Sequence, residues 1–260
     1  MLYQFVDNSI APELLLNEND HFSGELDAPL VLTEYLDFAC PFCAAVSPIV
    51  SQLEEDFEGD LLVVRRHLPL ETIHPNARAA ARVAEAAAQQ GFFEEMEELL
   101  FENQADWVGL NDPGPLFTSY AQELNLDMTQ YTTDIMSAEL NARITEDAND
   151  AAALQLVSTP SFFLDNQVIA TPATGTQFAA LIQSELDNLG EAYSIDRATG
   201  EIIVLDNSLI EDETFDVLAT NAQGGTETIT VTINATAATA SGVLSSGLVD
   251  DAVQNEDDWL

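Results

Sequence analysis

The stretch Leu30–Cys43, LVLTEYLDFACPFC, decides the fold that this sequence predicts. Residues 30–38 are mostly apolar and are typical of a buried strand, and the residues after the cysteines have helical spacing. Cys40 and Cys43 are the only two cysteines among 260 residues. A Cys-x-x-Cys pair at a strand-to-helix junction is the geometry of a thiol–disulfide exchange site.

The position of each residue in this pair favours redox chemistry. Cys40 would stand at the helix N-terminus, where free backbone N–H groups and the helix dipole stabilise a thiolate. Cys43 follows one turn later on the same face and could close a disulfide. Pro41 fits the first helical turn, where its missing N–H costs nothing.

Two other interpretations of the pair stay open, half of a zinc site and a purely structural disulfide. Zinc would need two more ligands, and His21, His67 and His74 are the nitrogen donors, without paired spacing. A disulfide that closes so short a loop constrains little of the unfolded chain and adds little stability. We therefore favour a redox-active pair, with no metal and no cofactor beyond the disulfide itself.

The charge of the chain limits its partners. There are 46 acidic residues against 6 basic ones, all arginine, for a formal net charge of -40. Nucleic acid and anionic membrane surfaces would repel such a chain. The acids are spread throughout, which favours a surface adapted to high salt, because the Debye length falls to about 3 Å at molar ionic strength. A fold equally stable at low and molar salt would contradict this halophilic interpretation.

The sequence predicts neither a membrane span nor a secretory leader. No apolar run approaches the roughly 18 residues needed to cross a bilayer. Residues 1–20 lack a basic segment followed by an apolar one. The expected compartment is the cytoplasm, or the periplasm or cell exterior if a leader was removed before Met1.

The remaining elements follow from periodicity and from turn residues. After a short helix at 11–16 and the elements around the cysteines, we expect a second buried strand at 61–64 and an Ala-rich helix from Pro75 to Gln89. A β-hairpin at 162–169 follows Pro160. Further helices are predicted at about 92–100, 115–124, 128–136, 138–156 and 175–189. This order predicts an α/β fold in which a helical block is inserted into a small mixed sheet.

The chain resembles the DsbA-like branch of the thioredoxin superfamily over residues 22–190. The resemblance is carried by motifs in a fixed order: Asp27-Ala28-Pro29, Asp37-Phe38-Ala39-Cys40-Pro41-Phe42-Cys43, Ile73-His74-Pro75-Asn76-Ala77, Leu100–Gln104 with Trp107, and Thr159-Pro160-Ser161-Phe162-Phe163. It implies a thioredoxin-like fold with a helical insertion at about 75–156. Residues 1–21 would be a lead-in.

The resemblance also implies roles for individual residues. Thr159-Pro160 would be a cis peptide beside the cysteines that presents its backbone to an extended substrate, with Pro41 and Phe42 part of the same substrate-binding surface. Glu34 would be a buried acid that exchanges a proton with Cys43, and burial would raise its pKa towards neutrality. His74 and Trp107 are expected to pack or cap.

Two departures from the family pattern leave the direction of electron flow open. Phe42 stands where the best-known oxidants of the family carry His, which removes one source of thiolate stabilisation. Thr159 before the proline resembles the isomerase and reductase branches as much as the oxidases.

Residues 192–235 form a second unit, predicted to be a small all-β segment with strands at 202–205, 214–220 and 226–233. It resembles half of a cadherin-like repeat, which would allow dimerisation through strand edges; removing residues 192–260 and comparing the oligomeric state would test this. Asp206, Glu211 and Asp212 are weak calcium candidates, since calcium takes six to eight oxygens. Residues 236–260 are expected to be an acidic flexible tail.

The sequence thus favours a thiol–disulfide oxidoreductase that exchanges the Cys40–Cys43 disulfide with cysteine-containing substrate proteins and an unidentified redox partner. The alternative is a surface interaction or adhesion protein with a structural disulfide and a cadherin-like module. A small-molecule transferase relative is disfavoured, because such relatives generally lack the second cysteine.

Overall fold

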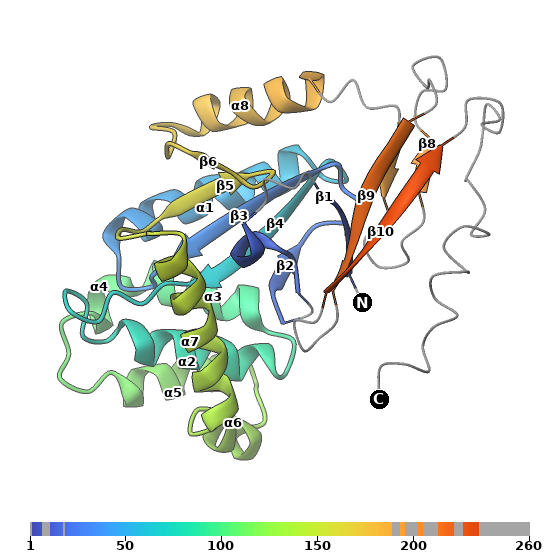
Figure 1. Ribbon diagram of the computed structural model, residues 1–260. Helices are drawn as coiled ribbons and strands as arrows, with labels where there is room; N and C mark the ends of the chain where they lie inside the picture. Colours follow the sequence, from blue (N-terminus) through green and yellow to red (C-terminus); the bar gives the residue numbers. More distant parts are fainter. Residues whose placement is uncertain are drawn as a thin grey trace, which may run out of the picture.

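The computed structural model of the protein describes residues 2–6, 11–17 and 19–188, together with the strand residues 193–195, 202–204, 213–220 and 226–233. Two β-regions are present, a five-stranded sheet with the helices around it and a set of strands formed by both ends of the chain (Figure 1). Within the described residues, no helix combines the length and the apolar character needed to cross a membrane.

The cysteine pair follows β3, which is the central strand of the five-stranded sheet. Its strand order is β2-β4-β3-β5-β6. β3 pairs in parallel with β4 and antiparallel with β5, and the outer strands β2 and β6 are antiparallel to their neighbours. The strands span His21–Ser23 (β2), Leu30–Leu36 (β3), Leu61–His67 (β4), Ser161–Leu164 (β5) and Gln167–Ile169 (β6).

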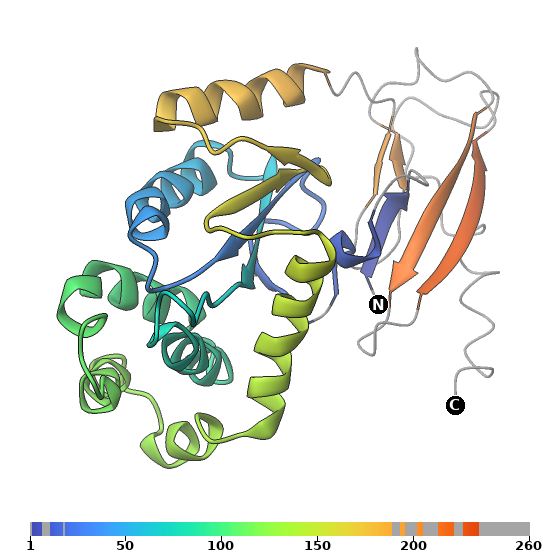
Figure 2. The same ribbon diagram turned by 60° about the vertical axis from the view of Figure 1, so that its left-hand side comes forward.

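Alternate residues of β3 face two different layers of helices. Leu30 and Leu32 pack in one core with α1 (Pro41–Asp56) and α8 (Gly175–Asn188). Tyr35, which points the other way, packs with Ala151 of α7 (Ala138–Ala153). Figure 2 shows α1 and α8 on one side of the sheet and α7 on the other. Glu34 has the same parity as Leu32, so it lies on the α1 face.

The inserted helical block lies beyond the ends of β3 and β4 (Figures 1 and 2), and its core also takes in Leu36, Phe38 and both cysteines. Trp107 is fully buried in this core and donates its indole N–H to the carbonyl of Leu100 at 2.9 Å. The block comprises α2 (Ala77–Ala88), α3 (Phe93–Glu102), α4 (Gln104–Trp107), α5 (Gly114–Glu123) and α6 (Met128–Asp134), and α7 returns the chain to the sheet.

The predicted fold is confirmed, with shifts at element ends that have local causes. The strand predicted at 30–38 ends at Leu36, because the Asp37 carboxylate accepts the N–H of Ala39 at 2.8 Å and turns the chain. The helix predicted from Pro75 begins at Ala77. The hairpin turn falls on Asp165 and Asn166, both at positive φ, a conformation that Asp and Asn tolerate better than most residues. The short strand β2 was not expected.

The second β-region joins the two ends of the chain. β1 (Leu2–Val6), which belongs to the segment expected to be a lead-in, pairs antiparallel with β9 (Glu213–Thr220), and β9 pairs with β10 (Thr226–Ile233). β7 (Tyr193–Ile195) and β8 (Ile202–Val204) form a separate pair. The three calcium candidates and the tail 236–260 lie outside the described residues.

A buried arginine fixes the segment before β2 against the other face of the sheet. Arg66, on β4, is 1% exposed and makes a bidentate contact with Asp20, with N···O distances of 2.9 and 2.7 Å. It also donates to the Leu15 carbonyl and the Tyr35 hydroxyl. Arg143 of α7 makes a further contact with Asp20. Asp20 and its two arginine partners therefore link β4, α7 and the segment before β2.

Replacing Asp20 with Ala should destabilise the protein by about 3–5 kcal/mol, because it leaves a buried guanidinium without its counter-charge. The measurement is denaturant unfolding. Glu71→Ala is the matched control, since Glu71 pairs with Arg78 on the surface and exposed pairs contribute less than about 1 kcal/mol. Equal losses in the two variants would contradict the assignment.

Candidate active site

The cysteine pair stands at the junction of β3 and α1, as the sequence predicts. Cys40 is the N-cap residue of α1, in extended conformation, and Pro41 occupies the first turn. The N–H of Cys40 donates to the Asp37 carbonyl at 2.9 Å, which closes the turn between strand and helix. The two sulfur-bearing residues are 4% and 0% exposed, so the pair reaches solvent through Cys40 alone.

The two thiols have opposite acidities. A hydrogen bond from the Cys43 thiol, with support from the backbone N–H groups of Cys43 and Phe42, lowers the pKa of Cys40 to about 5 against the opposing effect of burial. Burial first, then the hydrogen bond to Cys40 and the charge of Glu34, raise the pKa of Cys43. At neutral pH the pair therefore holds one thiolate, on Cys40, and one thiol, on Cys43.

The Thr159–Pro160 segment lies directly against Cys40. The peptide bond between the two residues is cis, as the resemblance implies. The Cys40 thiol is 3.3 Å from the Thr159 carbonyl oxygen. The Thr159 hydroxyl is buried without a partner among the described residues. The backbone just before the β5 strand is thus placed beside the sulfur that reaches solvent.

Glu34 lies beneath α1, on the strand face that the alternation of β3 predicts. It is 3% exposed, and it is close enough to Cys43 for its charge to raise the pKa of that thiol. Burial, then repulsion from Glu97, raise the pKa of Glu34 to about 8, although Arg65 acts in the opposite direction. The carboxyl group is therefore mostly protonated at neutral pH, so it can both donate and accept a proton.

Burial is the main reason that Glu34 keeps a proton, and a shortage of nearby positive charge adds to it. Arg65 is the neighbour that opposes it, and its guanidinium already pairs with Glu54 at 2.7 Å and with Glu97 at 2.8 Å. Burial also raises the pKa of Glu97. One arginine cannot balance three carboxylates in a buried setting, so retention of a proton is the favourable state.

Two supports of the site were not predicted as such. Gln104, from α4, donates its side-chain N–H₂ to the carbonyls of Phe38 and Cys40 at 2.7 and 2.9 Å. Asp37 accepts from the Leu70 N–H at 3.0 Å and pairs with His74 at 2.7 Å. Gln104 ties the cysteine turn to the helical block, and Asp37 ties it to the segment between β4 and α2. Gln104 was noticed only as part of the resemblance, because its partners are distant in sequence.

Two large apolar side chains are exposed in the segments next to Cys40 and Thr159. Phe42 is 72% exposed directly after Pro41, and Val157 is 86% exposed just before the Thr159–Pro160 bond. Exposed large apolar side chains that gather at one place are typical of interaction sites. This surface and the backbone at Thr159 flank the reactive sulfur.

A thioredoxin-like fold with one acidic thiol at a helix N-terminus, one buried thiol and a buried acid defines a thioredoxin-class protein with the groups needed for thiol–disulfide chemistry. A family profile described as Thioredoxin matches residues 16–184. The chain therefore belongs to this thioredoxin family.

Relatives of known name carry this region within much longer chains. The protein is 42% identical over 152 residues to "Na(+)/H(+) antiporter NhaA 1" of Mycolicibacterium vanbaalenii, a match that covers 57% of this chain and 24% of that protein. It is 37% identical over 150 residues to "Na(+)/H(+) antiporter NhaA" of Herminiimonas arsenicoxydans, covering 58% and 23%. The chain thus spans about a quarter of the length of these relatives.

Solved structures share the fold. The crystal structure of alpha-DsbA1 from Wolbachia pipientis superposes with a TM-score of 0.61 at 21% identity, covering 67% of this chain and 94% of that one. Oxidised BdbD from Bacillus subtilis gives a TM-score of 0.58 at 22% identity, covering 65% and 94%. Both matches confirm the fold, and neither extends over the whole chain. A cadherin-like relationship for the C-terminal segment found no support in these comparisons.

The raised pKa of Glu34 predicts a specific pH dependence of stability. The folded protein holds a proton between about pH 4.5 and 8 that the unfolded chain releases, so the free energy of unfolding falls as the pH rises through this range. Glu34→Gln removes this loss. The variant should gain stability relative to wild type by up to about 5 kcal/mol between pH 5 and 8.

The measurement is denaturant unfolding of the disulfide form at several pH values, so that Cys40 does not titrate in the same range. Glu55→Gln, an exposed position on α1, is the control and should follow the wild-type curve. If the difference between Glu34→Gln and wild type did not change with pH, Glu34 would not carry the buried proton.

Proposed function

We propose that this protein is a thiol–disulfide oxidoreductase that exchanges the Cys40–Cys43 disulfide with substrate proteins. The observation that carries the proposal is the asymmetry of the two thiols. The pKa of Cys40 is lowered to about 5 and that of Cys43 is raised. A structural disulfide has no need of this difference, whereas exchange needs one sulfur that attacks and leaves easily and one that waits protonated.

The reaction proceeds through a mixed disulfide. A substrate thiolate attacks the Cys40 sulfur of the oxidised pair, which forms a bond between substrate and Cys40 and breaks the bond to Cys43. The Cys43 sulfur leaves with the electron pair and takes a proton from Glu34. A second substrate thiolate then attacks the substrate sulfur, which releases Cys40 as a thiolate and completes the substrate disulfide. Two electrons pass to the protein.

The reverse reaction uses the same groups. Glu34 in its ionised form accepts the Cys43 proton, and the resulting thiolate attacks Cys40 to resolve a mixed disulfide. We expect the Thr159 carbonyl, 3.3 Å from the Cys40 sulfur, to pair with an extended substrate backbone. Phe42 and Val157 favour substrates with apolar side chains near the reacting cysteine.

The acidity of Cys40 favours disulfide donation. Stabilisation of the thiolate stabilises the reduced form, which makes the pair more oxidising. The backbone N–H groups and the Cys43 thiol supply this stabilisation, so Phe42 in place of a histidine does not remove it. Equilibration with glutathione buffers at high salt should give a potential closer to about -120 mV than to about -270 mV. A value below about -300 mV would mean that the disulfide is structural.

The two cysteine variants should differ in kind. Cys40→Ser should abolish catalysed disulfide exchange, because it removes the attacking sulfur. Cys43→Ser should instead accumulate covalent complexes with substrate proteins, visible on non-reducing gels, because the resolving sulfur is absent.

Alkylation of the reduced wild type provides the companion measurement. At pH 6.5 the reagent should modify Cys40 and leave Cys43 intact. Exchange activity in Cys40→Ser would contradict the proposal. A Cys40 that resists alkylation in the folded protein would favour the alternative of an interaction protein with a structural disulfide.

A further inference from the structure

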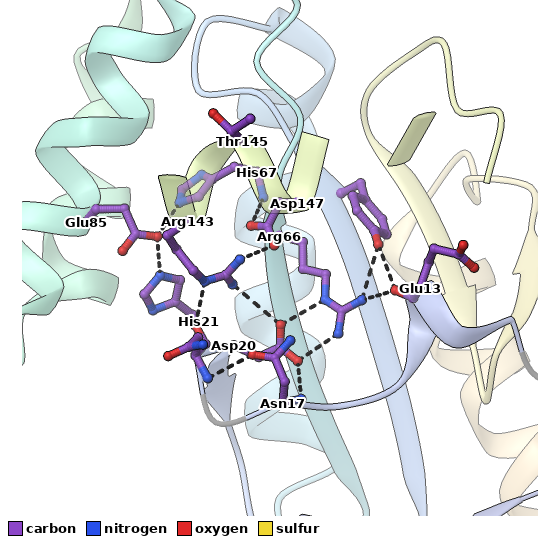
Figure 3. A network of polar contacts seen from close by, with 12 residues as sticks. Glu13, Asn17, Asp20, His21, Arg66, His67, Glu85, Arg143, Thr145 and Asp147 are labelled. Atoms are coloured by element: carbon purple, nitrogen blue, oxygen red, sulfur yellow. Dashed lines mark hydrogen bonds and ion pairs between the residues drawn. The ribbon is translucent and has the colours of Figure 1, made fainter. Parts of the chain in front are cut away.

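A second cluster of chemically reactive side chains lies away from the cysteines. His21 of β2, His67 of β4 and Glu85 of α2 each offer one ligand atom, and these atoms all lie within 4.8 Å of one another. The Nε2 atoms of both histidines contact the same oxygen, Oε1 of Glu85, at 2.8 and 2.9 Å. Figure 3 shows both imidazole rings pointing at this carboxylate.

The rings are held in place by packing that is independent of Glu85. His21 stacks on Phe93, with ring centroids 3.7 Å apart and an interplanar angle of 13°. His67 lies 5.9 Å from the ring of Phe38, and its backbone N–H donates to Asp147 at 2.8 Å. Strands and a long helix supply the three side chains, so their positions are fixed before any ligand arrives.

We propose that His21, His67 and Glu85 bind one divalent transition-metal ion, with Zn²⁺ as the best fit. Two imidazole nitrogens and one carboxylate oxygen form a known zinc ligand set. Metal–ligand bonds of about 2.0–2.1 Å in a tetrahedron place ligand atoms about 3.3 Å apart. The two N···O contacts of 2.8 and 2.9 Å must therefore lengthen by about 0.4–0.5 Å to admit the ion.

The surroundings favour a cation and leave room for a fourth ligand. His21 and Glu85 line an open cavity of about 1010 Å³, and Asp20 and Asp150 line it as well. Water from this cavity can complete the coordination. Burial opposes ionisation of Glu85, but the hydrogen bonds and charges of His21 and His67 outweigh it and lower the pKa of this carboxyl.

The nearby arginines are already neutralised by other acids. Arg143 pairs with Asp147 and contacts Asp20, and Arg66 pairs with Asp20. These two cations face Asp20, Asp147, Asp150 and Glu85, so the acids remain in excess. A bound Zn²⁺ would thus improve the local charge balance.

Metal binding would connect the sheet to the helical block. The ligands come from β2 and β4 of the sheet and from α2 of the insertion, so one ion would hold these three elements together. The site does not include the cysteines and does not depend on the proposed redox function.

The test uses Co²⁺ and Zn²⁺ with the full chain in its disulfide form, because free thiolates would bind both metals. Molar salt and excess Mg²⁺ suppress weak binding to surface carboxylates. Calorimetry should show one equivalent bound, the thermal midpoint should rise with Zn²⁺ concentration, and Co²⁺ should give the visible absorption of a tetrahedral complex. His21→Ala should weaken binding by at least about 10-fold.

His74→Ala is the matched control, because His74 pairs with Asp37 away from the cluster. It should bind the metal as wild type does. Absence of stoichiometric binding, or equal binding by His21→Ala and wild type, would overturn the proposal. If His21→Ala does not fold, NMR of the wild type decides: Co²⁺ should shift or broaden the ring signals of His21 and His67 strongly, and a selective effect on His74 would overturn the proposal.

Discussion

The parallel pairing of β3 with β4 is the constraint on which both buried polar sites depend. In its register Glu34 stands opposite Arg65, and Tyr35 stands opposite Arg66. Because neighbouring residues of a strand point to opposite faces, this one pairing places an acid and an arginine under α1 and an arginine and a tyrosine under α7. A shift of one residue would exchange the two faces and dismantle both sites.

The same strand pair gives two different outcomes because the number of cations differs. On the α7 face, Arg66 and Arg143 pair with Asp20 and Asp147, and these ion pairs hold three segments together. On the α1 face, Arg65 already pairs with Glu54 and Glu97. Its charge is too little to keep Glu34 ionised as well, so Glu34 keeps its proton. In a chain with only 6 basic residues, the placement of each arginine decides which buried acids become structural and which remain available for proton transfer.

The sequence predicted what is encoded locally. The strand, the Cys-x-x-Cys junction and the hairpin are short patterns with their own periodicity or turn residues, and the burial of Glu34 was implied by the family resemblance. The contacts of Gln104 and the meeting of His21, His67 and Glu85 depend on packing between elements 18 to 66 residues apart. The histidines were dismissed as zinc ligands for lack of paired spacing, a test that cannot detect ligands brought together by a sheet and a helix.

The lowered pKa of Cys40 and the raised pKa of Glu34 are connected by the number of protons that reduction of the disulfide requires. Reduction of a disulfide takes two electrons, and it takes two protons only if both thiols end protonated. Since the pKa of Cys40 is lowered to about 5, that sulfur remains a thiolate at neutral pH, and Cys43 alone requires a proton. Glu34, with a pKa of about 8 beside Cys43, holds one proton in the same pH range. The shortage of positive charge around Arg65 therefore provides the single proton that the reaction needs, at the sulfur that needs it.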